Sequence, residues 1–280
     1  MSRQLTILAA DTELYAVDTP GGPPPLLFLN GAFGTPQNWD RVIQRLAGKY
    51  RTVRFDARAR GKSGTSSAYS VHAAVGDIGR VIEATGIGPA ILVGWSHGAT
   101  TAVRYAAQHP GDVAGLLLLD GAYPIAMFDE VGKEKVRTRF RRLGWIMRIL
   151  AALGRSARMS RAETADVVIE VDAVNGELAP DFAALECPTA FVVGAGAHSG
   201  ATKNEMRTMR AAVAYAEASN RRVSVFATTP RKHTQILAKA SDTVVAAIED
   251  VIQQSFLTSV QPRGGARRRT AGKTPSVSAG

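Results

Sequence analysis

The stretch GWSHG, at residues 94–98, fits the pattern G-x-S-x-G and directly follows the short apolar run 90–93. A segment with helical composition, 99–109, comes next. A serine at a sharp turn between a strand and a helix exposes its hydroxyl above the sheet edge, and glycines flank it because side chains would collide with the neighbouring elements. Amide groups at the start of such a helix point at a developing oxyanion. Ser96 is therefore the candidate nucleophile for acyl transfer, and an ordinary turn between a strand and a helix is the alternative.

A serine nucleophile needs a general base, and the chain has five histidines for that role. Two lie in predicted helices, where surface or packing roles are expected. A third is adjacent to the serine in sequence, and its side chain should point away from the turn. The last two follow predicted strands and are the stronger candidates. The two in predicted helices are His72 and His109, the one next to the serine is His97, and the two that follow strands are His198 and His233.

The elements that would position these residues alternate between short apolar runs and segments of helical length. This alternation predicts βαβ units and a parallel sheet covered on both faces. An antiparallel pair of strands, 4–8 and 13–17, is expected before them. We therefore predict an α/β fold with a mostly parallel, eight-stranded sheet and helices on both faces. The other strands are expected at 25–29, 52–55, 90–93, 115–119, 189–193 and 223–226, and the helices at 38–47, 71–84, 99–109, 203–218 and 241–255.

The segment 123–185 interrupts this alternation, because it contains no clear strand. Apolar residues recur there at steps of three and four from Val136 to Leu153, which is typical of one face of an amphipathic helix. A second helical stretch follows at 162–174. We predict that 123–185 is a helical lid inserted between two strands. The remaining predicted boundaries are a core of residues 1–122 and 186–257 and a disordered basic tail at 258–280.

The net charge of +10 is concentrated in the lid and the tail. Ten lysines or arginines and one acid lie between Lys133 and Arg161, and residues 261–280 add five cations and no acid. A solvated helix face is the simplest interpretation. The alternatives are attraction of an anionic substrate or carrier, such as a coenzyme A thioester, and contact with an anionic membrane surface. No signature of a nucleic-acid-binding fold is present, so specific nucleic-acid binding is not expected.

Taken together, the order of the motifs resembles the α/β-hydrolase superfamily, over about residues 5–256. The stretch NGAFG, at 30–34, follows a predicted strand where members of that family carry His-Gly and the oxyanion loop. The stretch DARARGKS, at 56–63, is similar to the family's D-x-R-G-x-G-x-S turn, with Ala59 in place of a glycine. The resemblance implies a serine hydrolase with a nucleophile elbow at Ser96 and a helical lid.

The same resemblance implies roles for other residues. The oxyanion hole would use two backbone amides, that of Ala32, with Phe33 as the close alternative, and that of His97. The general base would be His233, because the family carries its catalytic histidine after the last strand. Asn30 replaces the usual histidine of the oxyanion loop, and this change should alter hydrogen bonding under the loop rather than the amides.

The triad acid departs from the family's usual pattern. Family members usually carry it after the seventh strand, in a G-x-x-D/E turn, but here Ala197 stands at that place in GAGA, 194–197. Some relatives take the acid from the end of the sixth strand, where this chain has Asp120. We predict Asp120, with Glu205 and the absence of any acid as alternatives. Loss of the acid in a serine protease lowers turnover about ten-thousand-fold.

The predicted function is hydrolysis of a small-molecule carboxylic ester, thioester or lactone through an acyl-enzyme on Ser96. The alternatives are an acyl transferase, a C–C hydrolase or lyase on the same fold, and a catalytically weak relative that binds a small molecule. Trp95 and Trp145 are candidate substrate-binding residues.

No metal or organic cofactor is implied, and the single cysteine, Cys187, excludes a multi-cysteine metal site. The N-terminus lacks a signal-peptide pattern, and no apolar run approaches the roughly 18 residues needed to cross a bilayer. We therefore expect a cytoplasmic protein.

Overall fold

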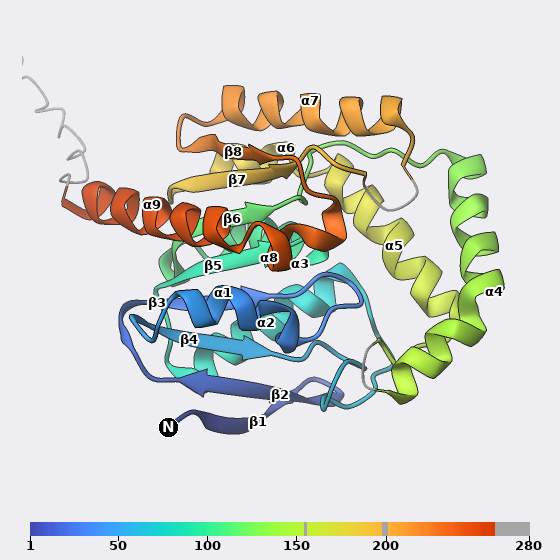
Figure 1. Cartoon of the computed structure of the whole chain (residues 1–280), viewed down its shortest axis with the longest axis horizontal. Helices are drawn as coiled ribbons and strands as arrows, with labels where there is room; N and C mark the ends of the chain where they lie inside the picture. Colours follow the sequence, from blue (N-terminus) through green and yellow to red (C-terminus); the bar gives the residue numbers. More distant parts are fainter. Residues whose placement is uncertain (154–155, 198–200, 261–280) are drawn as a thin grey trace, which may run out of the picture.

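Eight strands form a single sheet in the computed structural model, which describes residues 1–153, 156–197 and 201–260 (Figure 1). The strands are β1 (Arg3–Ala9), β2 (Thr12–Thr19), β3 (Gly22–Leu29), β4 (Tyr50–Phe55), β5 (Ala90–Trp95), β6 (Val113–Leu119), β7 (Thr189–Gly194) and β8 (Val223–Thr229). Their order in the sheet is β1-β2-β4-β3-β5-β6-β7-β8. β2 pairs antiparallel with β1 and with β4, and all pairs from β4 to β8 are parallel. The predicted fold class is therefore confirmed.

Helices cover both faces of this sheet. They are α1 (Asp40–Arg45), α2 (Val71–Thr85), α3 (His97–Gln108), α4 (Glu130–Ala152), α5 (Arg161–Gly176), α6 (Ala179–Ala184), α7 (Lys203–Ser219), α8 (Ile236–Lys239) and α9 (Ser241–Val260), with short 3₁₀ turns η1 (Pro36–Trp39), η2 (Pro110–Asp112) and η3 (His233–Gln235). Buried residues of α2, α3, α6 and α7 join one hydrophobic cluster, and those of α1, α8 and α9 join a second cluster on the opposite face.

The strand β6 shows why the apolar runs of the sequence form central strands. Its residues Leu116 and Leu118 belong to the first cluster, whereas Leu117 and Leu119 belong to the second, and all four are fully buried. Successive side chains of a strand point to opposite faces, so a strand covered on both faces must be apolar at every position. The uninterrupted run of leucines meets that requirement.

The sheet order creates a topological switch point beside β3. β4 and β5 follow β3 in the chain but lie on its two sides, and Leu29 at the end of β3 pairs with Gly94 near the end of β5. The segments that leave β3 and β5 are therefore neighbours at the carboxyl edge of the sheet. Ligands of open α/β sheets bind at such a point.

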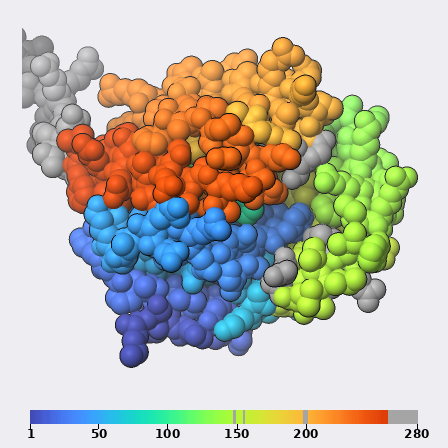
Figure 2. All heavy atoms as spheres, in the orientation of Figure 1, coloured from blue at the N-terminus to red at the C-terminus, as the bar shows by residue number. Residues whose placement is uncertain are grey.

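The segment between β6 and β7 contains α4, α5 and α6. α4 packs against α5 and stands at the outer edge of the molecule, on the side toward which β4 to β8 point (Figures 1 and 2). α6 behaves differently, because its Phe182 is fully buried in the first hydrophobic cluster and the helix packs against α3 and α7. Within the predicted lid, α6 is thus part of the helical layer of the core.

The end of the chain differs from the prediction by a few residues. α9 continues to Val260, beyond the predicted core boundary at residue 257, because no helix-breaking residue occurs before Pro262. The rest of the predicted tail, 261–280, lies outside the described residues. Among the helices that the structure describes, none combines the length and the apolar composition needed to span a bilayer.

Candidate active site

The turn between β5 and α3 carries Ser96 in an unusual backbone conformation. Ser96 has φ 56° and ψ −119°, a region that residues with a side chain rarely occupy, and α3 begins at the next residue. A Cβ on Gly98 would lie 2.2 Å from the carbonyl oxygen of Leu29, and one on Gly94 would lie 2.5 Å from that of Gly98. Both flanking glycines are therefore required by the close approach of β3, β5 and α3, and the turn has the geometry of a nucleophile elbow.

A buried histidine–carboxylate pair lies at the same edge of the sheet. His233 Nδ1 is 2.8 Å from Asp120 Oδ2, and the two residues are 7% and 3% exposed. Asp120 directly follows β6, and His233 follows β8. The pair orients the imidazole so that Nε2 is turned away from the carboxylate, as a general base requires.

Asp120 is held by more than the histidine. Its Oδ1 accepts hydrogen bonds from the Gly194 amide (3.0 Å) and from the Tyr123 hydroxyl (2.5 Å). Burial, followed by the nearby carboxylate, raises the pKa of Tyr123 well above its usual value, so the phenol stays protonated and remains a donor. These two donors leave Oδ2 for His233 and fix the direction of the carboxylate.

Backbone contacts bring Ser96 to this pair. The Ser96 amide donates to the carbonyl of Leu119, the residue before Asp120, at 3.0 Å. A Cβ on the following residue, Gly121, would lie 2.4 Å from the carbonyl oxygen of Ser96. On the other side, the ring of Trp95 lies 5.5 Å from that of His233, measured between centroids. The elbow, the acid and the base thus form one packed group.

The alternative acid and bases occupy other places. Glu205 caps the start of α7, where its carboxylate accepts a hydrogen bond from the Thr202 amide at 2.6 Å. His72 lies exposed on α2, and His109 stacks on Tyr105 at the end of α3. His198 lies outside the described residues. Of the two candidate acids, Asp120 and Glu205, Asp120 is the one hydrogen-bonded to His233.

The loop after β3 supplies the candidate oxyanion amides. Asn30 braces its base: Oδ1 accepts from Trp39 Nε1 (2.7 Å), and Nδ2 donates to the Phe55 carbonyl (3.3 Å). The Gly34 amide donates to the carbonyl of Gly31 at 3.0 Å, which closes a turn around Ala32 and Phe33. Asn30 therefore tethers the loop to the neighbouring β4 and η1.

Arg60 contacts this loop from below, a role that the sequence analysis missed. Its Nε donates to the Ala32 carbonyl at 2.8 Å, its Nη2 donates to the same oxygen, and its Nη1 donates to the Arg58 carbonyl at 2.6 Å. The guanidinium is buried, and burial lowers its pKa to about 10. Because the carbonyl of Ala32 and the amide of Phe33 belong to one planar peptide, a grip on the oxygen also fixes the direction of that N–H.

His97 contributes its backbone to the elbow and a neutral ring beneath it. The side chain is buried, and burial, with a smaller effect of the Arg60 charge, lowers its pKa to about 3. The imidazole is therefore uncharged at neutral pH. Because the His97 ring is neutral, no second positive charge lies beside the buried Arg60 guanidinium.

The two tryptophans expected at the substrate site differ. Trp95 is half-buried beside His233, and its ring packs against the oxyanion loop, since a Cβ on Gly31 would lie 3.1 Å from it. Its Nε1 is buried and has no hydrogen-bond partner within the described residues. Trp145 is 61% exposed on α4.

Comparison with known proteins supports the same fold. The family model of the alpha/beta hydrolase fold matches residues 24–160. Over 123 residues, 43% of this chain and 38% of the relative, the chain is 32% identical to Lipase 1 of Psychrobacter immobilis. Over 126 residues, 42% of this chain and 40% of the relative, it is 34% identical to the fluoroacetate dehalogenase of a Burkholderia species. The chain thus spans about two fifths of the length of these relatives.

The likeness to solved structures extends over nearly the whole chain. A structure from a study of carboxylesterases of Nitrososphaera gargenis has a TM-score of 0.70 and 18% identity, and the match covers 90% of this chain and 99% of that one. At this identity the likeness concerns the fold. Together with the matched family model and the elbow after β5, it shows that the chain has the α/β-hydrolase fold.

Proposed function

We propose that the protein is a serine hydrolase that cleaves a small-molecule carboxylic ester, thioester or lactone through an acyl-enzyme on Ser96. The observation that carries this proposal is the 2.8 Å hydrogen bond between His233 Nδ1 and Asp120 Oδ2, beside a serine in elbow geometry. A nucleophile, a base and an acid that orients the base are the parts that acyl transfer requires. Relatives that include a lipase support the same reaction class.

The reaction follows from these positions. Ser96 Oγ attacks the carbonyl carbon and its proton passes to His233 Nε2, while the ionised Asp120 accepts a hydrogen bond from Nδ1–H and stabilises the imidazolium. Backbone amides at Ala32 or Phe33 and at His97 donate to the oxyanion. The imidazolium then protonates the leaving group, and the bond between carbonyl and leaving group breaks. Water, deprotonated by the same histidine, releases the acyl group.

Labelling with a fluorophosphonate probe tests the proposal. The wild type should be labelled at Ser96, Ser96→Ala should not, and Ser219→Ala, which removes an exposed hydroxyl from the end of α7, should behave as the wild type. Labelled protein should also lose turnover of a p-nitrophenyl ester. A folded wild type that is neither labelled nor turns over activated esters would refute the proposal and favour a small-molecule-binding role. Product analysis with alcohol and thiol acceptors separates hydrolysis from acyl transfer.

A further inference from the structure

The second half of α4 exposes a row of large apolar side chains, which we call the apolar stripe. Trp145 is 61% exposed, Ile149 53% and Leu153 65%. The three follow one another at steps of four residues, so they lie on one side of the helix. Side chains of this kind are usually buried, and a continuous exposed row of them marks an interaction site.

The opposite side of the same helix faces inward. The ring of Phe140 packs 5.8 Å from that of Phe33 in the oxyanion loop. Gly144 is buried, and a Cβ there would lie 2.3 Å from Nε of Arg161, the first residue of α5. Phe140 and Gly144 therefore attach α4 to the rest of the protein. The apolar stripe is turned outward, on a helix that stands at the outer edge of the molecule (Figure 2).

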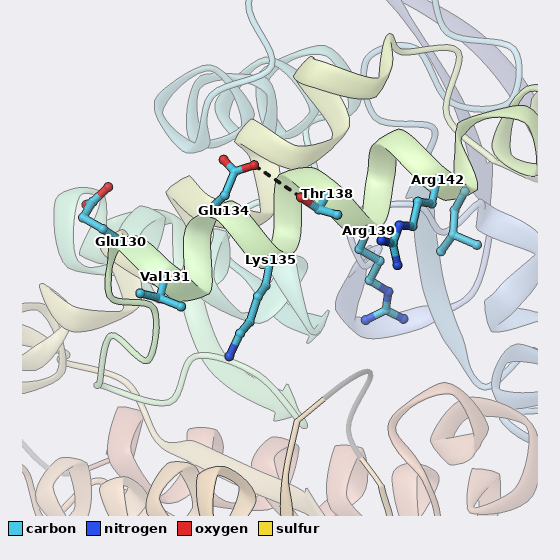
Figure 3. A pocket seen from close by; sticks show the side chains of 8 residues that line it. Glu130, Val131, Glu134, Lys135, Thr138, Arg139 and Arg142 are labelled. Carbon is cyan, nitrogen blue, oxygen red and sulfur yellow. Dashed lines mark hydrogen bonds between the residues drawn. The ribbon is translucent and has the colours of Figure 1, made fainter.

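Positive charge accompanies the apolar stripe. The helix α4 contains seven lysines or arginines and two glutamates. Lys135, Arg142 and Ile149 are spaced by seven residues, two helical turns, so the two cations lie on the side of the stripe, and Figure 3 shows both extending from the helix. Hydrogen bonds from Thr202 lower the pKa of Glu205 in α7, and the charge of Lys135 adds to this effect. With Glu205 counted as a third carboxylate, the cations still outnumber the acids, so this side of the protein is positive.

We propose that the outer side of α4 binds an anionic lipid surface, with the apolar stripe at the boundary between headgroups and acyl chains and with Lys135 and Arg142 at the level of the phosphates. Basic helices with an apolar side bind in the plane of a membrane through buried apolar area and attraction to anionic lipids. The indole of Trp145 suits this boundary because its body is apolar and its N–H is polar. Long cationic side chains keep their charge in water while their stems cover apolar groups. The inference goes beyond the proposed function, because binding to a surface does not depend on turnover.

Charge distinguishes the lipid surface from other occupants of this side of α4. A two-fold contact with a second copy of the chain would bring two equal basic helices together, and like charges in an interface repel. The segment 261–280, with five cations and no acid, has the same sign of charge as α4. A soluble acidic polypeptide supplies the opposite charge alone. An anionic lipid surface supplies that charge together with an apolar layer, and it adapts to a single protruding helix without a matching shape.

Vesicle sedimentation tests the proposal, with vesicles of phosphatidylcholine alone and vesicles that also contain phosphatidylglycerol. The wild type and Ser96→Ala should both bind the anionic vesicles about tenfold more tightly than the neutral ones, or more. The double variant Ile149→Gln/Leu153→Gln should lower the partition coefficient on anionic vesicles about ten- to hundredfold, because two apolar side chains are lost from the boundary. Arg142→Gln should lower it about fivefold, because one cation is lost.

The control variant is Tyr215→Gln/Leu257→Gln, which removes two apolar side chains that are 69% and 64% exposed on α7 and α9. It should keep the wild-type partition coefficient. Urea unfolding midpoints close to that of the wild type show that both double variants are folded. Equal losses in the two double variants would overturn the proposal in favour of general adhesion of exposed apolar groups.

The fluorescence of Trp145 reports whether the stripe enters the lipid. Its emission should shift to the blue on anionic vesicles and be quenched by brominated acyl chains, and Trp145→Phe should remove this quenching, because Trp39 is fully buried and Trp95 is half-buried beside His233. Binding without quenching and without an effect of Ile149→Gln/Leu153→Gln would overturn the proposal in favour of a purely electrostatic contact, which polyglutamate would also make. Failure to bind either kind of vesicle would overturn it as well, and a dimer that this double variant dissociates would then assign the stripe to a second copy.

Discussion

The substitution Arg60→Met removes the buried guanidinium that holds the Ala32 carbonyl. The side chain is 4% exposed, and, unlike Arg58, which pairs with Asp77 and Asp11, it forms no ion pair within the described part of the chain. A buried charge without a carboxylate partner is costly, so its retention calls for a functional reason. The two hydrogen bonds to one carbonyl of the oxyanion loop provide that reason.

The size of the effect follows from those bonds. A hydrogen bond from a charged donor contributes about 1.5–3 kcal/mol, and two that share one acceptor contribute about 2–4 kcal/mol to fixing the peptide. If that orientation is needed only when the oxyanion forms, kcat/KM should fall between about 30-fold and 1000-fold. Loss of a whole oxyanion donor costs about 100- to 1000-fold, which sets the same upper limit. We expect about 100-fold for Arg60→Met and about tenfold for Arg60→Lys, which keeps the charge but offers a single ammonium.

The assay compares kcat/KM per active site, titrated with the fluorophosphonate, with the affinity for a trifluoromethyl ketone analogue of the tetrahedral intermediate. Both should fall in parallel, while the affinity for the carboxylic acid product changes little. Arg158→Met is the control, because Arg158 donates to the carbonyls of Gly61 and Ser63 in the same turn, and none of its side-chain hydrogen bonds within the described residues reaches the oxyanion loop. Arg60→Met with wild-type kcat/KM and inhibitor affinity, even if its unfolding midpoint changes, would refute this reasoning.

Three further outcomes are expected. Asp120→Asn should lower kcat about 1000- to 10,000-fold, because an amide that donates to Nδ1 leaves the proton on Nε2, where it blocks uptake of the serine proton; a loss below tenfold in ester turnover would contradict this role. His97 has a pKa of about 3 in the folded protein against an ordinary value of 6.5, so as pH falls its side chain is protonated in the unfolded chain before it is protonated in the folded one. The free energy of unfolding should therefore fall by about 1.4 kcal/mol per pH unit as pH drops below 6.5. Urea titrations of the wild type and of His97→Asn should differ in this slope, and equal slopes would exclude the buried neutral ring as its source. Burial raises the pKa of the Cys187 thiol to about 11, so Ellman's reagent should react with it at pH 8 only after urea unfolds the protein, and rapid reaction in the native state would show that the thiol is accessible.

The positions of Ser96 and Asp120 could be predicted because each directly follows an apolar run, and His233 was assigned from the family resemblance, which places the base after the last strand. In a parallel sheet those ends meet at one edge, so strand order along the chain already places the three side chains together. The missing carboxylate at Ala197 was also visible in the sequence and pointed to β6. The structure adds the donors that hold the Asp120 carboxylate, Tyr123 and the Gly194 amide.

Other parts of the site could not be predicted, because their partners are backbone atoms. The contact of Arg60 with the Ala32 carbonyl joins two loops across the sheet edge, and nothing in the residue types identifies a carbonyl as the acceptor. The signal in the sequence that could have indicated this contact is Arg60, the second arginine of ARARGK at 57–62. A turn that already contains Arg58 has little need for another buried cation, so Arg60 could have been expected to bind an acceptor elsewhere. For Trp145, the residue type led to the prediction of a substrate-binding role, and the structure places its side chain on α4 with 61% of its surface exposed.

The position of Asp120 directly after β6 has a consequence for how the sequence of this protein can change. When the triad acid follows β7, the loop after that strand must keep a carboxylate aimed at the histidine. Here the loop contacts His233 through the main chain, because the His233 amide donates a hydrogen bond to the Ala197 carbonyl. A residue of any type at position 197 can supply that carbonyl. The side chain at position 197 is thereby released from the role of holding the histidine. A library that randomises position 197 and spares Asp120 should keep the hydrogen bond between His233 and Asp120.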